Sequence, residues 1–169
     1  MPLHVVLYNP EIPQNTGNIM RTCAATKAKL HLIEPLGFRI DNKFVKRSSA
    51  NHFEEAEYKL YLDWEEFIEK NQGEYVFLTR YGKKPPSSHD FSNIKQDIYL
   101  IFGKESTGIP KVILQKYLAT CYRLPMVDNM RSLNLANCVA IMVYEALRQQ
   151  NYHGLSTVEV LKGKDFIFD

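Results

Sequence analysis

Short apolar runs recur along the chain, separated by stretches rich in glycine, proline, asparagine and charged residues. Most runs are nearly continuous rather than alternating, which is typical of central strands covered on both faces of a sheet. The runs predict six strands, at residues 3–8, 30–34, 58–62, 75–80, 98–103 and 121–126.

Between these runs, apolar residues recur at spacings of three and four, the pattern of an amphipathic helix. Pro110 is well placed at the start of the predicted helix that carries Val112, Ile113 and Tyr117. The predicted apolar faces are Ile19, Met20, Cys23, Ala24 and Ala28, then Trp64, Phe67 and Ile68, then Val112, Ile113 and Tyr117.

The clearest helix is the final one, from Leu133 to about Gln150. It carries two stripes, one apolar and one that is polar near the helix start, so the helix can pack and also reach outward. The stripes are Leu133, Ala136, Ala140, Val143 and Leu147, and Asn134, Asn137, Ile141, Tyr144 and Arg148.

Alternating strands and helices predict an α/β fold with a mostly parallel sheet and helices on both faces. In such sheets ligands bind beyond the carboxyl ends of the strands. Three stretches that follow predicted strands are rich in glycine, asparagine, serine or arginine, at residues 8–21, 103–110 and 126–138. We therefore expect these loops to converge on one end of the sheet.

The composition fits one soluble globular domain over residues 1–169, because 45% of the residues are hydrophobic and 24% are charged. No apolar run approaches the roughly 20 residues of a membrane span, and the first residues lack signal-peptide features. We therefore expect a cytoplasmic protein. Cys23, Cys121 and Cys138 are widely separated and lie in apolar contexts, which predicts reduced, buried thiols and no metal site.

The net charge of +2 does not by itself indicate a nucleic-acid ligand. Residues 43–47, 80–84 and 162–164 form local basic clusters that can contact phosphates, although each taken alone also fits a solvated surface. Dinucleotide-binding, P-loop and serine-hydrolase motifs are absent from the sequence.

Three stretches, "NTGNIMR", "IFGKESTGIP" and "RLPMVDNMRSLNLANCVAIMVYEALRQ", together resemble the three successive motifs of the SPOUT superfamily of S-adenosylmethionine-dependent RNA methyltransferases. Their order, their spacing and the small size of the chain are most similar to the branch that methylates the wobble cytidine or carboxymethylaminomethyluridine of leucine tRNAs on the 2'-oxygen. The resemblance implies a C-terminal trefoil knot, a homodimer, a tRNA anticodon arm as partner, S-adenosylhomocysteine as product and no metal. Periodicity gives no sign of the knot.

The resemblance also implies site residues. Arg21, Ser132 and Asn134 are expected at the catalytic centre. Gly103 also fits a tight turn, and Ser132 also fits a cap on the final helix. The expected contacts to the methyl donor are Leu78, Thr79, Gly103, Glu105, Gly108, Leu124, Met126, Ser132 and Leu133.

For the RNA, we favour Arg21 as a phosphate anchor over a role as base, because a guanidinium stays protonated. Arg21 lies off the apolar stripe and is expected to point to the crevice. Asn15 and Asn18 fit either substrate contact or capping of the first helix, and Asn134 and Asn137 fit a bridge to the first motif or to a second subunit. Tyr144 fits the RNA, the dimer interface or the core. The expected substrate contacts are Asn15, Arg21, Lys104, Tyr144 and Arg148.

Two alternatives remain open from the sequence. One is the same chemistry at another tRNA or ribosomal RNA site. The other is a catalytically silent knotted RNA-binding module.

Overall fold

A six-stranded sheet forms the centre of the computed structural model, which describes residues 3–41, 43–50 and 57–168. The strand order is β3-β2-β1-β5-β4-β6, and all five neighbouring pairs are parallel. The strands are β1 (Leu3–Tyr8), β2 (Lys29–Ile33), β3 (Tyr58–Tyr61), β4 (Glu74–Leu78), β5 (Ile98–Phe102) and β6 (Cys121–Tyr122). All six predicted strands are confirmed, although β6 is shorter than residues 121–126.

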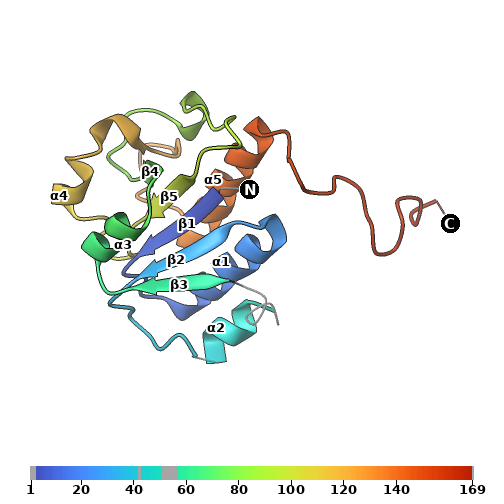
Figure 1. Cartoon of the computed structure of the whole chain (residues 1–169), viewed down its shortest axis with the longest axis horizontal. Coiled ribbons are helices and arrows are strands. Elements are labelled where there is room, and N and C mark those ends of the chain that lie inside the picture. Colours follow the sequence, from blue (N-terminus) through green and yellow to red (C-terminus); the bar gives the residue numbers. More distant parts are fainter. Residues whose placement is uncertain (1–2, 42, 51–56, 169) are drawn as a thin grey trace.

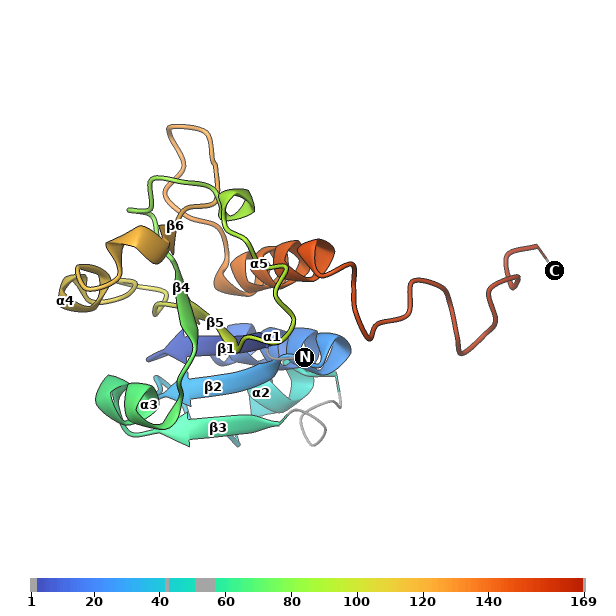
Figure 2. The same ribbon diagram turned by 45° about the horizontal axis from the view of Figure 1, so that its top comes forward.

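Helices cover both faces of the sheet, as predicted (Figures 1 and 2). One face carries α1 (Pro13–Thr26), α2 (Lys43–Ser48) and α5 (Leu135–Gln149). The other carries α3 (Trp64–Lys70) and α4 (Lys111–Leu114), and the short 3-10 turns are η1 (Pro86–Ser88) and η2 (Leu118–Thr120). The α2 helix, which contains the basic residues 43–47, was not predicted.

Two apolar cores lie on the two faces, and β1 contributes to both. Leu3, Val5 and Leu7 pack in the core under α1 and α5, whereas Val6 packs in the core with α3 and α4. This alternation follows from the two-residue period of a strand.

Some predicted buried positions were wrong. Val112 is 66% exposed because α4 is a single short turn that buries Ile113 and Leu114 instead. Cys138 is half-buried rather than buried, whereas Cys23 and Cys121 are buried. Leu133 is exposed because it precedes α5.

The segment after β4 lies against the segment after β6. The backbone N–H of Thr79 donates to the Tyr122 carbonyl at 2.9 Å, and that of Arg123 donates to the Lys84 carbonyl at 2.9 Å. At Gly82 the backbones are so close that an added Cβ would lie 2.3 Å from the Tyr122 carbonyl carbon. Figure 2 shows the orange segment between β6 and α5 standing away from the sheet beside the green segment that follows β4.

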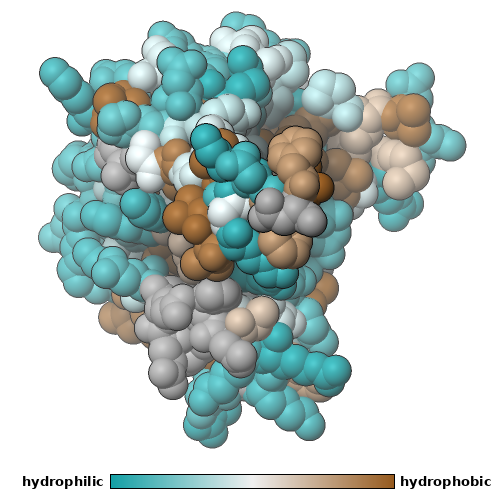
Figure 3. Space-filling model, turned by 90° about the vertical axis from the view of Figure 1, so that its right-hand side faces the viewer, coloured by the Kyte–Doolittle hydropathy of each residue, from teal (hydrophilic) through white to brown (hydrophobic). Residues whose placement is uncertain are grey.

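Beyond α5 the chain leaves the body as an extended tail (Figure 1). Its side chains include Leu161, which is 96% exposed, and Ile167, which is 81% exposed. Figure 3 views the molecule from the tail side and shows hydrophobic groups among hydrophilic ones. No helix in the described part of the chain is long and apolar enough to cross a membrane.

Candidate active site

A cavity of about 690 Å³ lies beyond the carboxyl ends of the strands. Its walls come from the start of α1 and from the segments that follow β4, β5 and β6. The predicted convergence of the three motif loops is therefore confirmed, and the volume is within the range of small-molecule sites.

All nine residues expected to contact the methyl donor line this cavity. Asn15, Lys104 and Asn134 line it as well. The nine are Leu78, Thr79, Gly103, Glu105, Gly108, Leu124, Met126, Ser132 and Leu133.

Glycine is required at two points of the wall after β5. A Cβ on Gly103 would lie 2.2 Å from the carbonyl carbon of Gly108 and 2.4 Å from the nitrogen of Ile109, so the loop closes on itself here. Gly108 has a φ of 73°, a left-handed conformation that favours glycine. Its N–H donates to the Lys104 carbonyl at 2.9 Å. Gly103 thus permits close backbone approach and also ends the strand.

The Glu105 carboxylate ties this wall to the start of α1. It accepts from the backbone N–H of Glu11 at 2.8 Å, from that of Ile12 at 3.2 Å and from Nδ2 of Asn15 at 3.0 Å. The cap residue of α1 is Ile12, which makes no side-chain capping bond. The capping role proposed for Asn15 and Asn18 was therefore wrong, because the helix already begins at Pro13 and both asparagines lie inside it.

Asn134 ties the third wall to the same point. Its Oδ1 accepts from the backbone N–H of Ala136 at 2.9 Å and of Asn137 at 3.3 Å, which makes it the N-cap of α5. Its Nδ2 donates to Oδ1 of Asn15 at 3.0 Å, so the predicted bridge to the first motif is confirmed. The capping role considered for Ser132 was wrong because the helix begins three residues later.

A second carboxylate runs between the same two loops in the reverse direction. Glu11 accepts from the backbone N–H of Ser106 at 2.8 Å and from its hydroxyl at 2.9 Å. These hydrogen bonds, the backbone one above all, hold the pKa of Glu11 below its usual value. The start of α1 and the loop after β5 are therefore joined by two crossed carboxylates.

Arg21 does not line this cavity. It lines a neighbouring hollow of about 330 Å³ between α1 and α5, together with Asn18, Asn137 and Tyr144. The structure thus brings Arg21 and Tyr144 together but separates them from the nine donor-site residues. Arg148 lies farther along α5, where its Nε and Nη2 donate to the Glu145 carboxylate at 3.0 and 2.9 Å.

Several cavity residues were not assigned from the sequence, although the basic cluster at residues 80–84 gave a signal for two of them. Burial raises the pKa of the Cys138 thiol, so it stays protonated at neutral pH. Among the described residues, no group of three or more histidine, cysteine, aspartate or glutamate side chains could hold a metal ion. The unassigned cavity residues include Arg80, Tyr81, Arg123, Arg131 and Cys138.

Comparison with known proteins decides the family. Residues 2–144 match the SpoU rRNA Methylase family. The chain belongs to this family. It is 50% identical over 157 residues to a Geobacillus stearothermophilus protein provisionally named tRNA (cytidine(34)-2'-O)-methyltransferase, a match that covers 92% of this chain and all of the relative.

Solved structures of SpoU-type enzymes share the fold. One, described as "Structural insights into the 2-OH methylation of C/U34 on tRNA", has a TM-score of 0.82 and 37% identity, and the match covers 90% of this chain and 100% of that chain. An AdoMet-bound rRNA methyltransferase from Sinorhizobium meliloti has a TM-score of 0.78 and 26% identity, over 91% of this chain and 57% of that chain. The resemblance inferred from the three motifs is therefore confirmed.

Proposed function

We propose that this SpoU-family protein transfers the methyl group of S-adenosylmethionine (AdoMet) to the 2'-oxygen of the wobble nucleotide, position 34, of tRNA. The relatives' names support the reaction and the substrate. The observation that carries the proposal for this chain is the meeting of three loops at Asn15, beside both the cavity and the Arg21 hollow.

The cavity fits the methyl donor. Its volume suits a ligand of this size, the tight closure of the loop at Gly103 shapes one wall, and Leu124 and Met126 supply apolar surface for an adenine ring. When bound, the donor supplies an electrophilic methyl group. We assign binding of the donor to the nine cavity residues expected to contact it, with Ser132 and Asn134 at the catalytic end.

The Arg21 hollow fits the RNA backbone. A guanidinium binds phosphate through two parallel N–H bonds, which fixes the orientation of the attached ribose. Arg21 in this role aligns the 2'-hydroxyl, whose proton passes to a base or to water as the methyl group is transferred. Tyr144 in the same hollow, Lys104 at the cavity and the Nη1 group of Arg148 are assigned to further RNA contacts. Asn15, expected from the sequence as a further contact, is instead 5% exposed, and its amide is bonded to Glu105 and Asn134, so it joins the walls of the site.

The donor cavity and the Arg21 hollow are linked by the hydrogen bonds that join Glu105, Asn15 and Asn134. Asn134 caps α5 and lines the donor cavity, whereas Ala136 and Asn137 in the first turn of α5 line the Arg21 hollow. We infer that these hydrogen bonds set the position of the anchored ribose relative to the donor.

We further propose a homodimer in which the Arg21 hollow is completed by a second copy. Tyr144, which lines the hollow and is 50% exposed, supplies surface for such a contact, and so does Ile141, which is 44% exposed and follows the lining residue Ala140 on α5. Activity that persists after dilution to monomers would contradict this arrangement.

Three finer features belong to the same proposal. The contacts between residues 79–84 and 122–123 support a trefoil knot, with the chain after β6 threaded past the segment after β4. The motif resemblance supports leucine tRNAs as the substrates. A tRNA substrate supports action in the cytoplasm. The three motifs, spread over most of the chain, support a single catalytic domain.

The test is incubation with AdoMet labelled in its methyl group and bulk tRNA, followed by nuclease digestion and mass spectrometry. The proposal predicts label on the ribose of nucleotide 34. Label on a base would contradict the reaction type, whereas label on the ribose of another tRNA nucleotide would contradict only the substrate.

A further inference from the structure

A tight turn presents two side chains at the mouth of the donor cavity. The N–H of Gly82 donates to the Thr79 carbonyl at 3.2 Å, which places Arg80 and Tyr81 at the two central positions of a four-residue turn. The N–H of Tyr81 also lies 3.3 Å from Oγ1 of Thr79. Arg80 and Tyr81 both line the cavity.

Contacts with Tyr122 and Arg123 hold the turn in place. Thr79 bonds to the Tyr122 carbonyl, and the close approach of Gly82 to Tyr122 leaves no space between the two backbones. Nη1 of Arg123 donates to the Arg80 carbonyl at 3.0 Å. The tip therefore has a fixed position relative to the cavity, and a side chain on it loses little freedom when it binds a ligand.

Tyr81 is 72% exposed, the most exposed tyrosine among the described residues. The guanidinium carbon of Arg80 lies 5.7 Å from the centre of its ring, within the range of a cation–π contact. An aromatic ring that is exposed at a cavity mouth and backed by a cation has an open face for another flat π-system.

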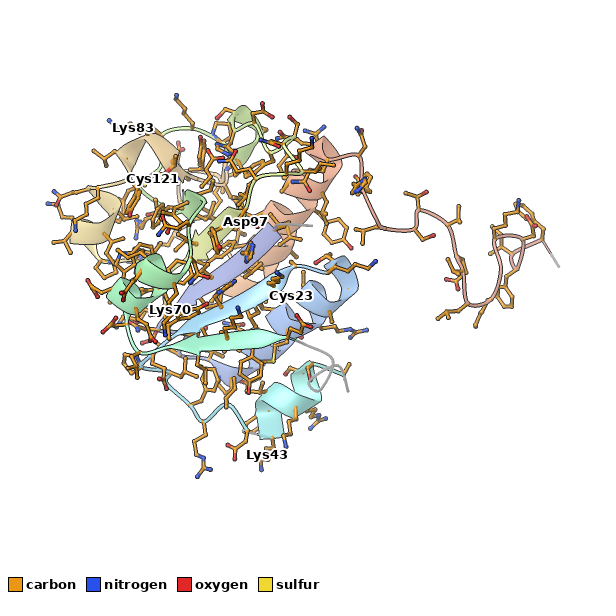
Figure 4. The ribbon with its side chains drawn as sticks, in the orientation of Figure 1. Cys23, Lys43, Lys70, Lys83, Asp97 and Cys121 are labelled. Carbon is orange, nitrogen blue, oxygen red and sulfur yellow. The ribbon has the colours of Figure 1, made fainter. Side chains whose placement is uncertain are left out.

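The surroundings carry positive charge. Lys83 and Lys84 follow on the same segment and are exposed, and Arg131 lines the cavity from the segment before α5. Figure 4 shows Lys83 at the edge of the molecule away from the C-terminal tail. Phosphates that flank a stacked base would meet these cations.

We propose that Tyr81 is a stacking platform for an unpaired nucleobase of the RNA substrate, with Arg80, Lys83 and Lys84 contacting the adjoining phosphates. A single-stranded RNA loop fits because its bases are unstacked and can lie on an aromatic ring. The inference rests on the proposed function and adds to it a contact on the donor side of the site, distinct from the Arg21 hollow.

The test uses an anticodon stem-loop RNA in which 2-aminopurine replaces each anticodon nucleotide in turn. Binding to the full-length protein should quench the fluorescence at one of these positions, and Tyr81→Ala should remove that quenching and weaken RNA binding by about 5- to 150-fold. Tyr81→Trp should restore both. AdoMet affinity and melting temperature should stay unchanged in both variants.

Phe166→Ala is the matched control, because Phe166 is 55% exposed with Lys162 4.8 Å above its ring but lies on the tail. It should bind RNA like the unmodified protein. Tyr81→Ala with RNA affinity within twofold, or with weakened AdoMet binding and unchanged RNA binding, would overturn the inference. If methyl transfer to tRNA proceeds normally in that case, only the Tyr81 role fails, whereas a wild-type protein without transfer refutes the proposed function itself.

Discussion

Asn134 donates from Nδ2 to Oδ1 of Asn15 at 3.0 Å, across 119 residues of sequence. Asn15 in turn donates to Glu105, so one buried amide joins the first, second and third motif segments. An amide is suited to this place because it donates and accepts at once, which neither a carboxylate nor a hydrocarbon of the same shape does.

Asn15→Ala should destabilise the fold and weaken AdoMet binding. The change leaves Nδ2 of Asn134 and one oxygen of Glu105 without this partner, and such losses cost about 1–3 kcal/mol in a buried site. Urea denaturation and calorimetric titration measure the two effects. The neighbouring exposed Gln14→Ala is the control, and equal behaviour of the two variants would show that the bridge is not needed.

Asn15→Asp separates hydrogen bonding from shape. A carboxylate at this position would face the Glu105 carboxylate at about the present 3.0 Å, with no donor between them. We expect weaker AdoMet binding than in Asn15→Ala at pH 8 and partial recovery near pH 5, measured by titration at both pH values. Binding that is independent of pH would speak against this geometry.

Arg21→Ala should reduce kcat/KM for tRNA by about 100-fold or more, because a misplaced ribose loses its alignment with the donor. AdoMet affinity should stay within twofold, since Arg21 lies outside the donor cavity. Arg21→Lys should fall between, because it keeps the charge but not the two-pronged geometry. Arg39→Ala, at an exposed arginine paired with Asp41, is the control. Loss of AdoMet binding in Arg21→Ala would refute the anchoring role.

Gly103→Ala should weaken AdoMet binding at least about tenfold. The added Cβ would meet backbone atoms of Gly108 and Ile109 at 2.2 and 2.4 Å, so the cavity wall must shift. Gly73→Ala introduces a similar clash, 2.4 Å from the Asp97 carbonyl oxygen, at the amino ends of β4 and β5 and so at the opposite end of the strands from the cavity. The control should lose stability but keep its AdoMet affinity, and a comparable loss of affinity in both would assign the effect to general destabilisation.

A buried histidine pair should make stability fall in acid. His31 lies 2.8 Å from His4 and 2.8 Å from the Tyr61 hydroxyl, and His4 also contacts Asp97. Burial lowers the pKa of His31 to about 3 and also lowers the pKa of His4, against the opposing effect of Asp97.

The sign follows from the unfolded state, where both groups have a pKa near 6.5 and take up protons first. The contribution of the two histidines to stability is therefore fully present above about pH 6.5 and is lost as pH falls toward the folded pKa values. The loss is up to about 1.4 kcal/mol per pH unit for each histidine. His31→Gln should be less stable at pH 7.5 but should lose less between pH 6.5 and pH 4.5. Parallel pH profiles in urea denaturation would contradict this prediction.

The sequence predicts the strands well because their apolar runs are continuous and bounded by turn residues, as in β1 and β5. Helix starts were less accurate. Pro13 at the first helical position was a usable signal that α1 begins before the asparagines, whereas the cap of α5 could be placed on Ser132 or Asn134 with equal chemistry.

The site was predicted by motif rather than by physics, and the separation of Arg21 from the donor cavity was missed. Once α1 begins at Pro13, Arg21 follows Asn15 by six residues, or about 600° of helix rotation, and therefore faces elsewhere. Asn18 and Arg21 are three residues apart and share the second hollow. The crossed bonds of Glu11 and Glu105 depend on contacts more than 90 residues apart, which no local pattern reveals.

The most direct test of the proposed reaction compares two tRNA molecules that differ only in the sugar of nucleotide 34, one with ribose and one with 2'-deoxyribose. With labelled AdoMet, the ribose form should accept one methyl group per molecule and the deoxy form none, while both bind the protein with similar affinity. Equal methylation of the two would contradict transfer to the 2'-oxygen of the wobble nucleotide.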